Sequence, residues 1–254
     1  MGIVEAGEPA VQRAVLPLTV QNVYRDRYRA IRPEWRSSGE RLEAMVRTRV
    51  TPSSQVLDLG CGRGGVMELF WRDVRLAAGV DADASSLIEH RSEGMPVIRG
   101  TAERLPFTSD SFDLVVCVWV LEHLRDPAAV FDELRRVLRP GGHFLFLTPN
   151  LRHPLMALNR LGKAMPALQR RLVPKLYGRA EADTFPVRYQ VNTVGDLRRH
   201  AQAAGLVVDE LHVVPDPTYL ALNPVMFRMS VLADRLIPSS WGIHLVGDLA
   251  RPSR

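Results

Sequence analysis

The fold follows from one stretch of the sequence, Val56-Leu57-Asp58-Leu59-Gly60-Cys61-Gly62-Arg63-Gly64-Gly65. Its first half continues a short apolar run that starts at Gln55 and is interrupted by one acid, which predicts a buried strand of a parallel sheet. The glycine cluster follows directly, and residues 66–70 begin a helical pattern. Strand, glycine turn and helix together predict the first half of a βαβ unit. In such a turn Gly60 can adopt the positive φ of a sharp bend, and Gly62 presents no Cβ to a ligand.

The acids around the glycines indicate which ligand the turn binds. Gly60 and Gly62 fit both G-x-G-x-x-G and G-x-G-x-G, because glycines stand at positions 64 and 65. Asp58 precedes them by two residues, and a carboxylate there would repel a pyrophosphate but attract an ammonium group. A second apolar strand, expected at 76–80, ends in Asp81, about twenty residues after the glycines, which is the spacing of a ribose-binding acid. We therefore expect a nucleoside that carries a cation rather than a diphosphate.

These features resemble the first two motifs of the class I S-adenosylmethionine-dependent methyltransferases. The resemblance extends over roughly residues 50 to 150 and is strongest to the small-molecule branch that includes the ubiquinone and menaquinone methyltransferases. The segments that carry it are Val56 to Gly64, Gly79 to Asp81, Gly100 to Phe107, Ser111 to Val116, Val120 to His123, Leu138 to Gly142 and Thr148 to Asn150. It implies an α/β fold, a doubly wound Rossmann-like seven-stranded sheet whose last strand is antiparallel, with an α-helical cap.

The resemblance also implies the cofactor, S-adenosyl-L-methionine, with S-adenosyl-L-homocysteine as product. Asp58 is then expected near the methionine end, Asp81 and the following Ala82 at the ribose, and Thr101 to Glu103 at the adenine. Many relatives carry an acid where this chain has Thr101, so the side-chain contact to adenine can pass to Glu103. The full set of expected cofactor residues is Asp58, Gly60, Cys61, Gly62, Gly64, Asp81, Ala82, Thr101, Ala102, Glu103, Val118 and Trp119.

Residues that act on the acceptor are less evident. Methyl transfer from a sulfonium is an in-line displacement, so the protein chiefly holds the reactants in line. A general base is needed only when the nucleophile retains its proton. His123, after the fourth strand, is the leading candidate for this base, and the alternative is that it only packs and caps the next helix. Further candidates for substrate contact are Tyr24, Tyr28, Asn150, His153 and Tyr189, each with a structural alternative.

The rest of the chain alternates between strand and helix patterns, which predicts a doubly wound sheet. Strands are expected at 96–99, 112–119, 143–147, 206–214 and 241–249, and helices at 84–91, 128–138 and 194–204. We expect residues 1–50 to form an N-terminal helical cap segment, broken at Pro33, and 51–254 to form the methyltransferase domain. This domain would carry cap insertions at about 150–190 and 215–240. Cys61 and Cys117 are interpreted as small buried residues, and no metal-binding cluster is expected.

The segment 151–179 is basic and amphipathic, with leucines and methionines between arginines and lysines. Its charges can simply be solvated, can face an anionic substrate, or can lie on an acidic membrane surface and collect a lipid-linked acceptor. Nucleic acid is disfavoured as a partner, because aromatic residues are not interleaved with the basic ones. The N-terminus has no apolar signal region and the chain no unbroken membrane span, so the expected location is the cytoplasm, with possible peripheral membrane contact.

The sequence thus predicts a methyltransferase that acts on oxygen or carbon of a small, lipid-like or glycoconjugate acceptor. Two rival classes use the same glycines. An NAD(P)-dependent oxidoreductase should have basic or neutral groups in place of Asp58. A non-catalytic S-adenosylmethionine-binding protein would keep the cofactor pocket and lack a formed acceptor site.

Overall fold

The computed structural model describes residues 18–157 and 186–253 of the 254-residue chain. Contacts divide the chain into two compact units, which we call the sheet unit and the helical unit. The sheet unit comprises residues 35–156, 187–216 and 237–254, and the helical unit comprises 1–34, 157–186 and 217–236. No helix of the described residues is long and apolar enough to cross a membrane.

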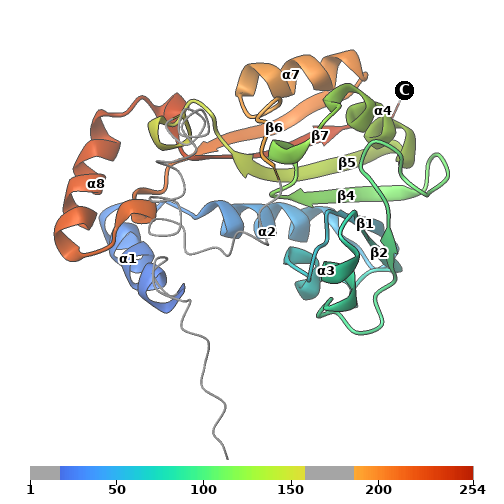
Figure 1. Ribbon diagram of the computed structural model, residues 1–254, viewed down its shortest axis with the longest axis horizontal. Coiled ribbons are helices and arrows are strands. Elements are labelled where there is room, and N and C mark those ends of the chain that lie inside the picture. Colours follow the sequence, from blue (N-terminus) through green and yellow to red (C-terminus); the bar gives the residue numbers. More distant parts are fainter. Residues whose placement is uncertain (1–17, 158–185, 254) are drawn as a thin grey trace, which may run out of the picture. The chain divides into compact units, whose positions relative to one another are not determined.

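The sheet unit is built on a seven-stranded sheet in the order β3-β2-β1-β4-β5-β7-β6 (Figure 1). The pairs from β3 to β5 are parallel, and β7 is antiparallel to both β5 and β6. This confirms the predicted seven strands with the last one antiparallel. The strands are β1 (Gln55–Leu59), β2 (Leu76–Asp81), β3 (Val97–Arg99), β4 (Phe112–Val118), β5 (Leu138–Pro149), β6 (Val207–Val214) and β7 (His244–Ala250).

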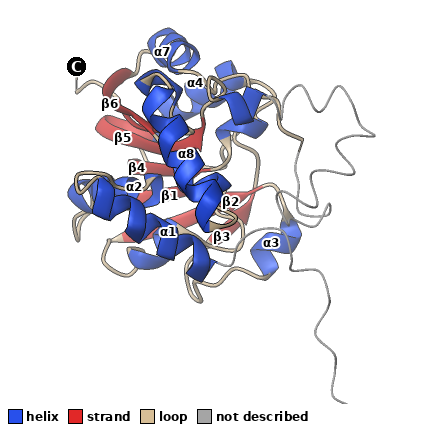
Figure 2. Cartoon of the chain, turned by 90° about the vertical axis from the view of Figure 1, so that its left-hand side faces the viewer, coloured by secondary structure: helices blue, strands red, loops and turns tan. Residues whose placement is uncertain are grey.

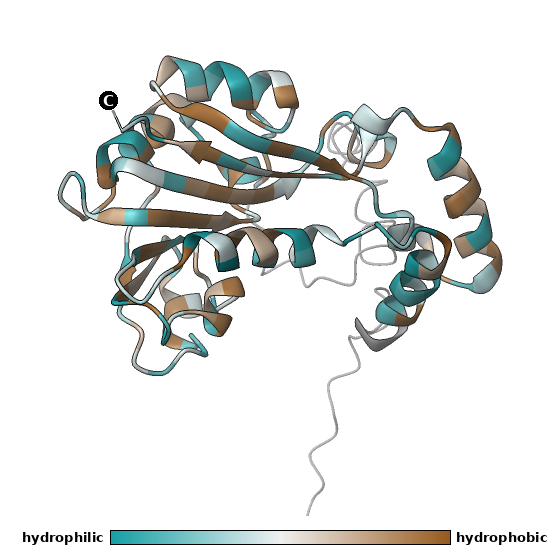
Figure 3. Cartoon of the chain, turned by 180° about the vertical axis from the view of Figure 1, so that it is seen from behind, coloured by the Kyte–Doolittle hydropathy of each residue, from teal (hydrophilic) through white to brown (hydrophobic). Residues whose placement is uncertain are grey.

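Helices cover both faces of this sheet, with α2 (Ser38–Arg49) on one face and α4 (Pro127–Val137) and α7 (Val194–Ala203) on the other (Figure 1). Two apolar cores result, one between the sheet and α2 and one between the sheet and α4 with α7. Figure 3 shows why both faces need cover, since most of β4 and the second half of β5 are apolar. Each of these helices begins at a side-chain cap, provided by Ser37, Asp126 and Thr193.

Three predicted elements differ in extent from the sequence expectation. The expected helix after the glycine turn is only a 3₁₀ turn, η1 (Val66–Leu69), because the chain must return over a short connection to β2. The helix expected at 84–91 is the single-turn α3 (Ala84–Ile88), because the chain then bends back and Arg91 N–H donates to the carbonyl of Arg63. Strand β5 begins five residues before the predicted start at 143, through an irregular register with β4 that accommodates Pro140 and two glycines.

The helical unit, as far as it is described, consists of α1 (Leu18–Ile31), the 3₁₀ turn η4 (Pro217–Leu220) and α8 (Pro224–Leu236). Helices α1 and α8 lie side by side (Figure 2), with the ring centroids of Tyr24 and Phe227 5.1 Å apart. Tyr28 is fully buried, and its hydroxyl donates to Oδ2 of Asp234 at 2.8 Å. Helix α2 belongs to the sheet unit. The predicted domain boundary at residue 50 stays a prediction. That the helical segments cap the cofactor site stays a prediction.

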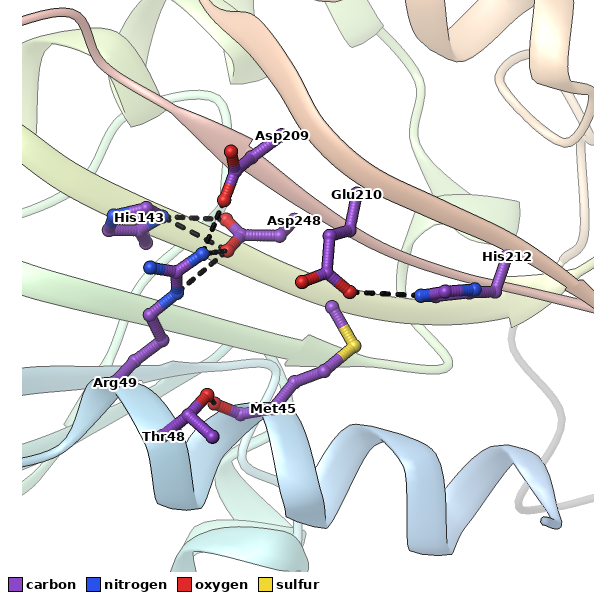
Figure 4. Close-up of polar contacts among 8 residues, drawn as sticks. All are labelled: Met45, Thr48, Arg49, His143, Asp209, Glu210, His212 and Asp248. Carbon is purple, nitrogen blue, oxygen red and sulfur yellow. Dashed lines mark hydrogen bonds and ion pairs between the residues drawn. The ribbon is translucent and has the colours of Figure 1, made fainter. Parts of the chain in front are cut away.

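An ion-pair cluster connects the end of α2 to strands β5, β6 and β7 (Figure 4). Asp248 on β7 is buried, accepts from Nε of Arg49 at 3.0 Å and lies 2.9 Å from Nδ1 of His143. Arg49 also donates to Asp209 on β6. Potential ligand atoms of His143, Asp209 and Asp248 lie within 4.8 Å of one another, a spacing that a metal ion could use. Because the Arg49 guanidinium already bridges both carboxylates, we interpret the cluster as structural.

Replacing Arg49 by Met should lower the free energy of unfolding by about 2–4 kcal/mol, because Asp248 is left buried without its main cation. Urea unfolding measures the change. The control is Arg199→Met, which removes an exposed pair with Asp196 and should change stability by at most about 0.5 kcal/mol. Equal losses in the two variants would show that Asp248 does not depend on Arg49.

Candidate cofactor and active site

The glycine turn follows β1 and is hydrogen-bonded to the carboxyl end of β2. Gly60 has a φ of 76°, and its N–H and that of Cys61 both donate to the carbonyl of Val80. A Cβ on Gly60 would overlap Cγ2 of Val120, the second residue after β4. This position therefore requires glycine for its conformation and for the close approach of the β4 end. Cys61 is buried with its sulfur over Gly79, so it presents its backbone to the turn.

Asp81 organises the other side of the turn through both carboxylate oxygens. Oδ2 accepts from Gly62 N–H at 2.9 Å, and Oδ1 accepts from Asp83 N–H at 2.8 Å. A Cβ on Gly62 would meet nothing closer than 4.0 Å, so the space next to its backbone is open toward Asp81. The side chain is half-buried, and each oxygen keeps a lone pair for a further donor. Asp81 can thus accept hydrogen bonds from a diol at the carboxyl edge of the sheet.

Asp58 is buried in the middle of the sheet, where β1 pairs with β2 and β4. No donor reaches its carboxylate from the described residues. Burial raises the pKa of Asp58 from 3.8 to about 7, and the carboxylates of Asp81 and Glu68 add to the rise. Two acids thus flank the glycine turn, with Asp58 poorly compensated. A cationic group placed at this edge would stabilise the ionised form of Asp58.

The turn after β3 lies beside Asp81, whose carbonyl accepts from Gly100 N–H at 2.9 Å. Thr101 is exposed and pairs with Arg104 across this turn, while Ala102 packs against the core under α4. The structure therefore brings the predicted adenine residues, Thr101 to Glu103, next to Asp81 and the exposed Ala82. Within the sheet unit, the predicted cofactor residues gather at the ends of β1, β2 and β3.

The end of β4 provides the next part of the site. Trp119 follows Val118 with a φ of 60°, an uncommon conformation for a bulky residue, and its N–H donates to the carbonyl of Leu147 at 2.9 Å. Its ring lies edge-on to His244, with centroids 4.9 Å apart. Nδ1 of the buried His244 lies 2.8 Å from Oγ of Ser38. Strained residues concentrate at functional sites. The role of Trp119 at the cofactor stays a prediction.

A buried polar network follows at the 3₁₀ turn η2 (Leu121–His123) and the end of β5. Glu122 is buried and accepts from Oγ1 of Thr148 at 3.1 Å, and Asn192 donates to the same hydroxyl at 2.7 Å. Oδ1 of Asn192 is buried and has no donor among the described residues. Nε2 of His123 lies 4.0 Å from the Glu122 carboxylate, with the His123 side chain half-buried. This arrangement can orient the imidazole.

Neither Thr148 nor Asn192 was predicted as a site residue from the sequence. Thr148 stands in a resembling segment but carries no chemical signal by itself. Asn192 becomes visible only through the fold, because it lies more than forty residues further along the chain. Tyr189, which was predicted, joins the same region: its N–H donates to the carbonyl of Glu122 at 3.1 Å, and its φ is 54°.

Other predicted substrate residues have structural partners. Asn150 is fully buried and donates to the carbonyls of Ser240 and Gly242, while its Oδ1 accepts from Arg152 N–H. His153 Nδ1 accepts from Leu155 N–H at the start of a helical turn. Tyr24 and Tyr28 form the interior of the helical unit. Their predicted roles toward a substrate stay predictions. Most of segment 151–179 lies outside the described residues.

Gly60→Ala should lower the free energy of unfolding by about 2 kcal/mol or more, because it adds strain at positive φ and an overlap with Val120. Gly39→Ala is the matched control, since a Cβ there meets nothing within 4 Å inside helix α2, and it should be neutral or stabilising by up to about 1 kcal/mol. Chemical unfolding of both variants measures the difference. An unchanged free energy of unfolding in Gly60→Ala would contradict the close approach of Val120 to the glycine turn.

Asp58→Asn should stabilise the ligand-free protein at alkaline pH. The folded-state pKa of Asp58 is raised, so its contribution to stability is full below about pH 4 and is lost as the pH rises to about 7. The asparagine variant should therefore gain relative to the parent protein across this range, by at most about 4 kcal/mol. Unfolding curves at pH 4.5 and pH 8 test this, with the exposed Asp73→Asn as control. A difference that does not change with pH would contradict the raised pKa.

Comparison with known protein families gives a match to the methyltransferase domain family over residues 57–146. A Bacillus subtilis protein described as the uncharacterized methyltransferase YcgJ is 35% identical, over 44% of this chain and 47% of its own. Ubiquinone biosynthesis O-methyltransferase of Hahella chejuensis is 35% identical, over 43% of this chain and 49% of its own. Phthiotriol/phenolphthiotriol dimycocerosates methyltransferase of Mycobacterium tuberculosis is 36% identical, over 38% of each. The chain thus spans less than half the length of these relatives.

Solved structures share the fold over most of the chain. A putative sarcosine dimethylglycine methyltransferase from Galdieria sulphuraria has a TM-score of 0.59 and 15% identity, over 85% of this chain and 86% of its own. Geranyl diphosphate C-methyltransferase from Streptomyces coelicolor was solved with geranyl diphosphate and S-adenosyl-L-homocysteine. It has a TM-score of 0.58 and 16% identity, over 84% of this chain and 77% of its own. The [4+2]-cyclase SpnF has a TM-score of 0.57 and 16% identity, over 87% of each chain. At these identities the likeness concerns the fold.

The site fits the cofactor of the matched family, S-adenosylmethionine. The open backbone at Gly62 and the free lone pairs of Asp81 suit a ribose, and the uncompensated carboxylate of Asp58 suits a cationic group. A dinucleotide would bring a pyrophosphate to the same acids and be repelled. Residues 57–146 thus match the methyltransferase domain family, and the site that they form fits S-adenosylmethionine.

Proposed function

We propose that this protein transfers a methyl group from S-adenosylmethionine to an oxygen or carbon atom of a small, lipid-like or glycoconjugate acceptor. One observation carries the proposal: Asp58, a buried carboxylate to which no described residue donates, stands beside a glycine turn whose open side faces a second carboxylate, Asp81. A ligand that brings both a diol and a cation satisfies both acids.

In this proposal each part of the carboxyl edge holds one part of the cofactor. Asp81 binds the ribose hydroxyls, and the turn from Thr101 to Glu103 contacts the adenine, with Ala102 supplying a backbone N–H. Asp58 attracts the charged methionine end, and the turn from Gly60 to Gly64 lies along its chain. Trp119 and Val118 line the side from which the acceptor approaches. When bound, the cofactor supplies an electrophilic methyl on a sulfonium, so the residues mainly align the acceptor atom.

His123 is proposed to remove the acceptor's proton when the nucleophile is a hydroxyl. The Glu122 carboxylate, 4.0 Å from Nε2, would stabilise the imidazolium that forms. Thr148 and Asn192 are proposed positioning residues, because they hold Glu122 in place. Oδ1 of Asn192 remains as a buried acceptor that a hydroxyl of the acceptor molecule could satisfy.

The proposed acceptor class draws on the relatives and on the chain. Two relatives are named for ubiquinone and for dimycocerosates, and a structural neighbour binds geranyl diphosphate; each joins an apolar part to a polar group. In this chain, aromatic side chains stand at the end of β4 and at Tyr189, which suits an acceptor with an apolar part. The basic segment 151–179 is proposed to contact an anionic acceptor or a membrane that contains it.

Two rival functions make different predictions. An NAD(P)-dependent oxidoreductase would bind a dinucleotide against the carboxylates of Asp58 and Asp81, which electrostatics disfavours. A protein of this fold need not methylate, since one structural neighbour is the [4+2]-cyclase SpnF. Binding of the sulfonium cofactor without label transfer to any acceptor would favour such a function.

The test is methyl transfer from S-adenosylmethionine labelled in its methyl group to extracts of small metabolites and of lipids. We expect label in a product and an equal amount of S-adenosylhomocysteine. Asp81→Ala should weaken cofactor binding at least tenfold, whereas Asp73→Ala, an exposed acid before β2, should not. His123→Asn should lower kcat by about 100-fold with little change in KM for the cofactor, and remove the acid limb of the pH profile. Full activity of Asp81→Ala would contradict the proposed site.

A further inference from the structure

Helix α8 carries an apolar stripe on its outer face. Val225, Met229, Leu232 and Leu236 are 64, 66, 60 and 80% exposed. Their spacing of four, three and four residues aligns them along one side of the helix. The opposite side is already used, because Phe227 and Val231 are buried in the helical unit. Isolated exposed apolar residues are ordinary, but four aligned on a 13-residue helix indicate an interaction surface.

The charges around this stripe have one sign. Arg228 and Arg235 are exposed and, by helical geometry, lie along the same edge of the stripe. The acid of α8, Asp234, is turned toward α1, where it accepts from the Tyr28 hydroxyl and lies 3.8 Å from Arg32. The exposed face of α8 therefore presents apolar side chains and cations, with no acid of the helix among them.

A hollow adjoins the basic edge of the stripe. It has a volume of about 260 Å³ and is lined by Ile31, Phe227, Arg228, Val231, Leu232 and Arg235. Apolar residues of α1 and α8 line it, together with both arginines of the stripe's edge. This combination suits an anionic headgroup at the guanidinium groups and acyl carbons against the apolar side chains.

We propose that the outer face of α8 is a docking surface for an anionic lipid bilayer. The apolar stripe enters the boundary between headgroups and acyl chains, while Arg228 and Arg235 remain at the headgroup level and bind phosphates. A second copy of the chain is a poorer occupant, because a matching α8 face would bring no acid to these arginines. This proposal concerns the helical unit alone and does not depend on methyl transfer.

Vesicle flotation of the full chain tests the proposal, with phosphatidylglycerol mixed into phosphatidylcholine and with phosphatidylcholine alone. We expect binding to the anionic vesicles, weakened by high salt. The double variant Met229→Glu/Leu232→Glu should lose binding by at least tenfold, and Arg228→Gln/Arg235→Gln by roughly tenfold. The matched control is Ile88→Glu, which alters an 86% exposed apolar residue of α3 and should bind within twofold of the parent chain.

Thermal unfolding and S-adenosylmethionine binding of each variant verify that the fold and the cofactor site are intact, so that a lost vesicle interaction reports the surface itself. Undiminished binding by Met229→Glu/Leu232→Glu would overturn the proposal, because another segment would then carry the contact. Absence of binding by the parent chain would overturn it too. A dimer in sedimentation equilibrium that dissociates in the stripe variant would replace the bilayer by a second copy.

Discussion

The candidate site depends on the electrostatic cost of Asp58. A carboxylate buried between neighbouring parallel strands loses its hydration, and no described residue donates a hydrogen bond in return. The neighbouring carboxylates of Asp81 and Glu68 raise the cost, which appears as a pKa near 7. A cationic ligand offsets this cost, so the structure favours a positively charged nucleoside over an anionic dinucleotide. A cationic ligand that relieves this unfavourable burial binds more tightly and stabilises the folded protein in return.

Around this position, backbone geometry brings the site together. The parallel register ends β1, β2 and β4 at one edge, and Gly60 lets Val120 approach the turn without a Cβ between them. After β4 the chain enters Trp119 in a left-handed conformation and then the turn that carries Glu122 and His123. The backbone carbonyl of the same Glu122 accepts a hydrogen bond from the N–H of Tyr189. The predicted cofactor residues and the residues proposed for the acceptor side are thus connected by a few backbone contacts.

The sequence predicted the parts whose signal is local. The glycine turn, Asp58, Asp81 and the alternation of strands and helices were all evident, and the antiparallel last strand followed from the family resemblance. The lengths of α3 and of the turn after the glycines were overestimated, because apolar spacing does not reveal how short the return to the next strand is. Asn192 was missed since its buried partners, Thr148 and Glu122, lie far away in the chain. Arg49 and Asp248 were missed for the same reason.

Calorimetric titration of the purified protein with S-adenosylmethionine, S-adenosylhomocysteine and NADH addresses the central claim directly. Both sulfur nucleosides should bind with one-to-one stoichiometry, and the cationic amino-acid end they share should make their affinity fall as the pH drops below about 7, where Asp58 takes up its proton. NADH should not bind. Binding of NADH in place of the sulfur nucleosides would contradict the assignment of the glycine turn and the two acids beside it.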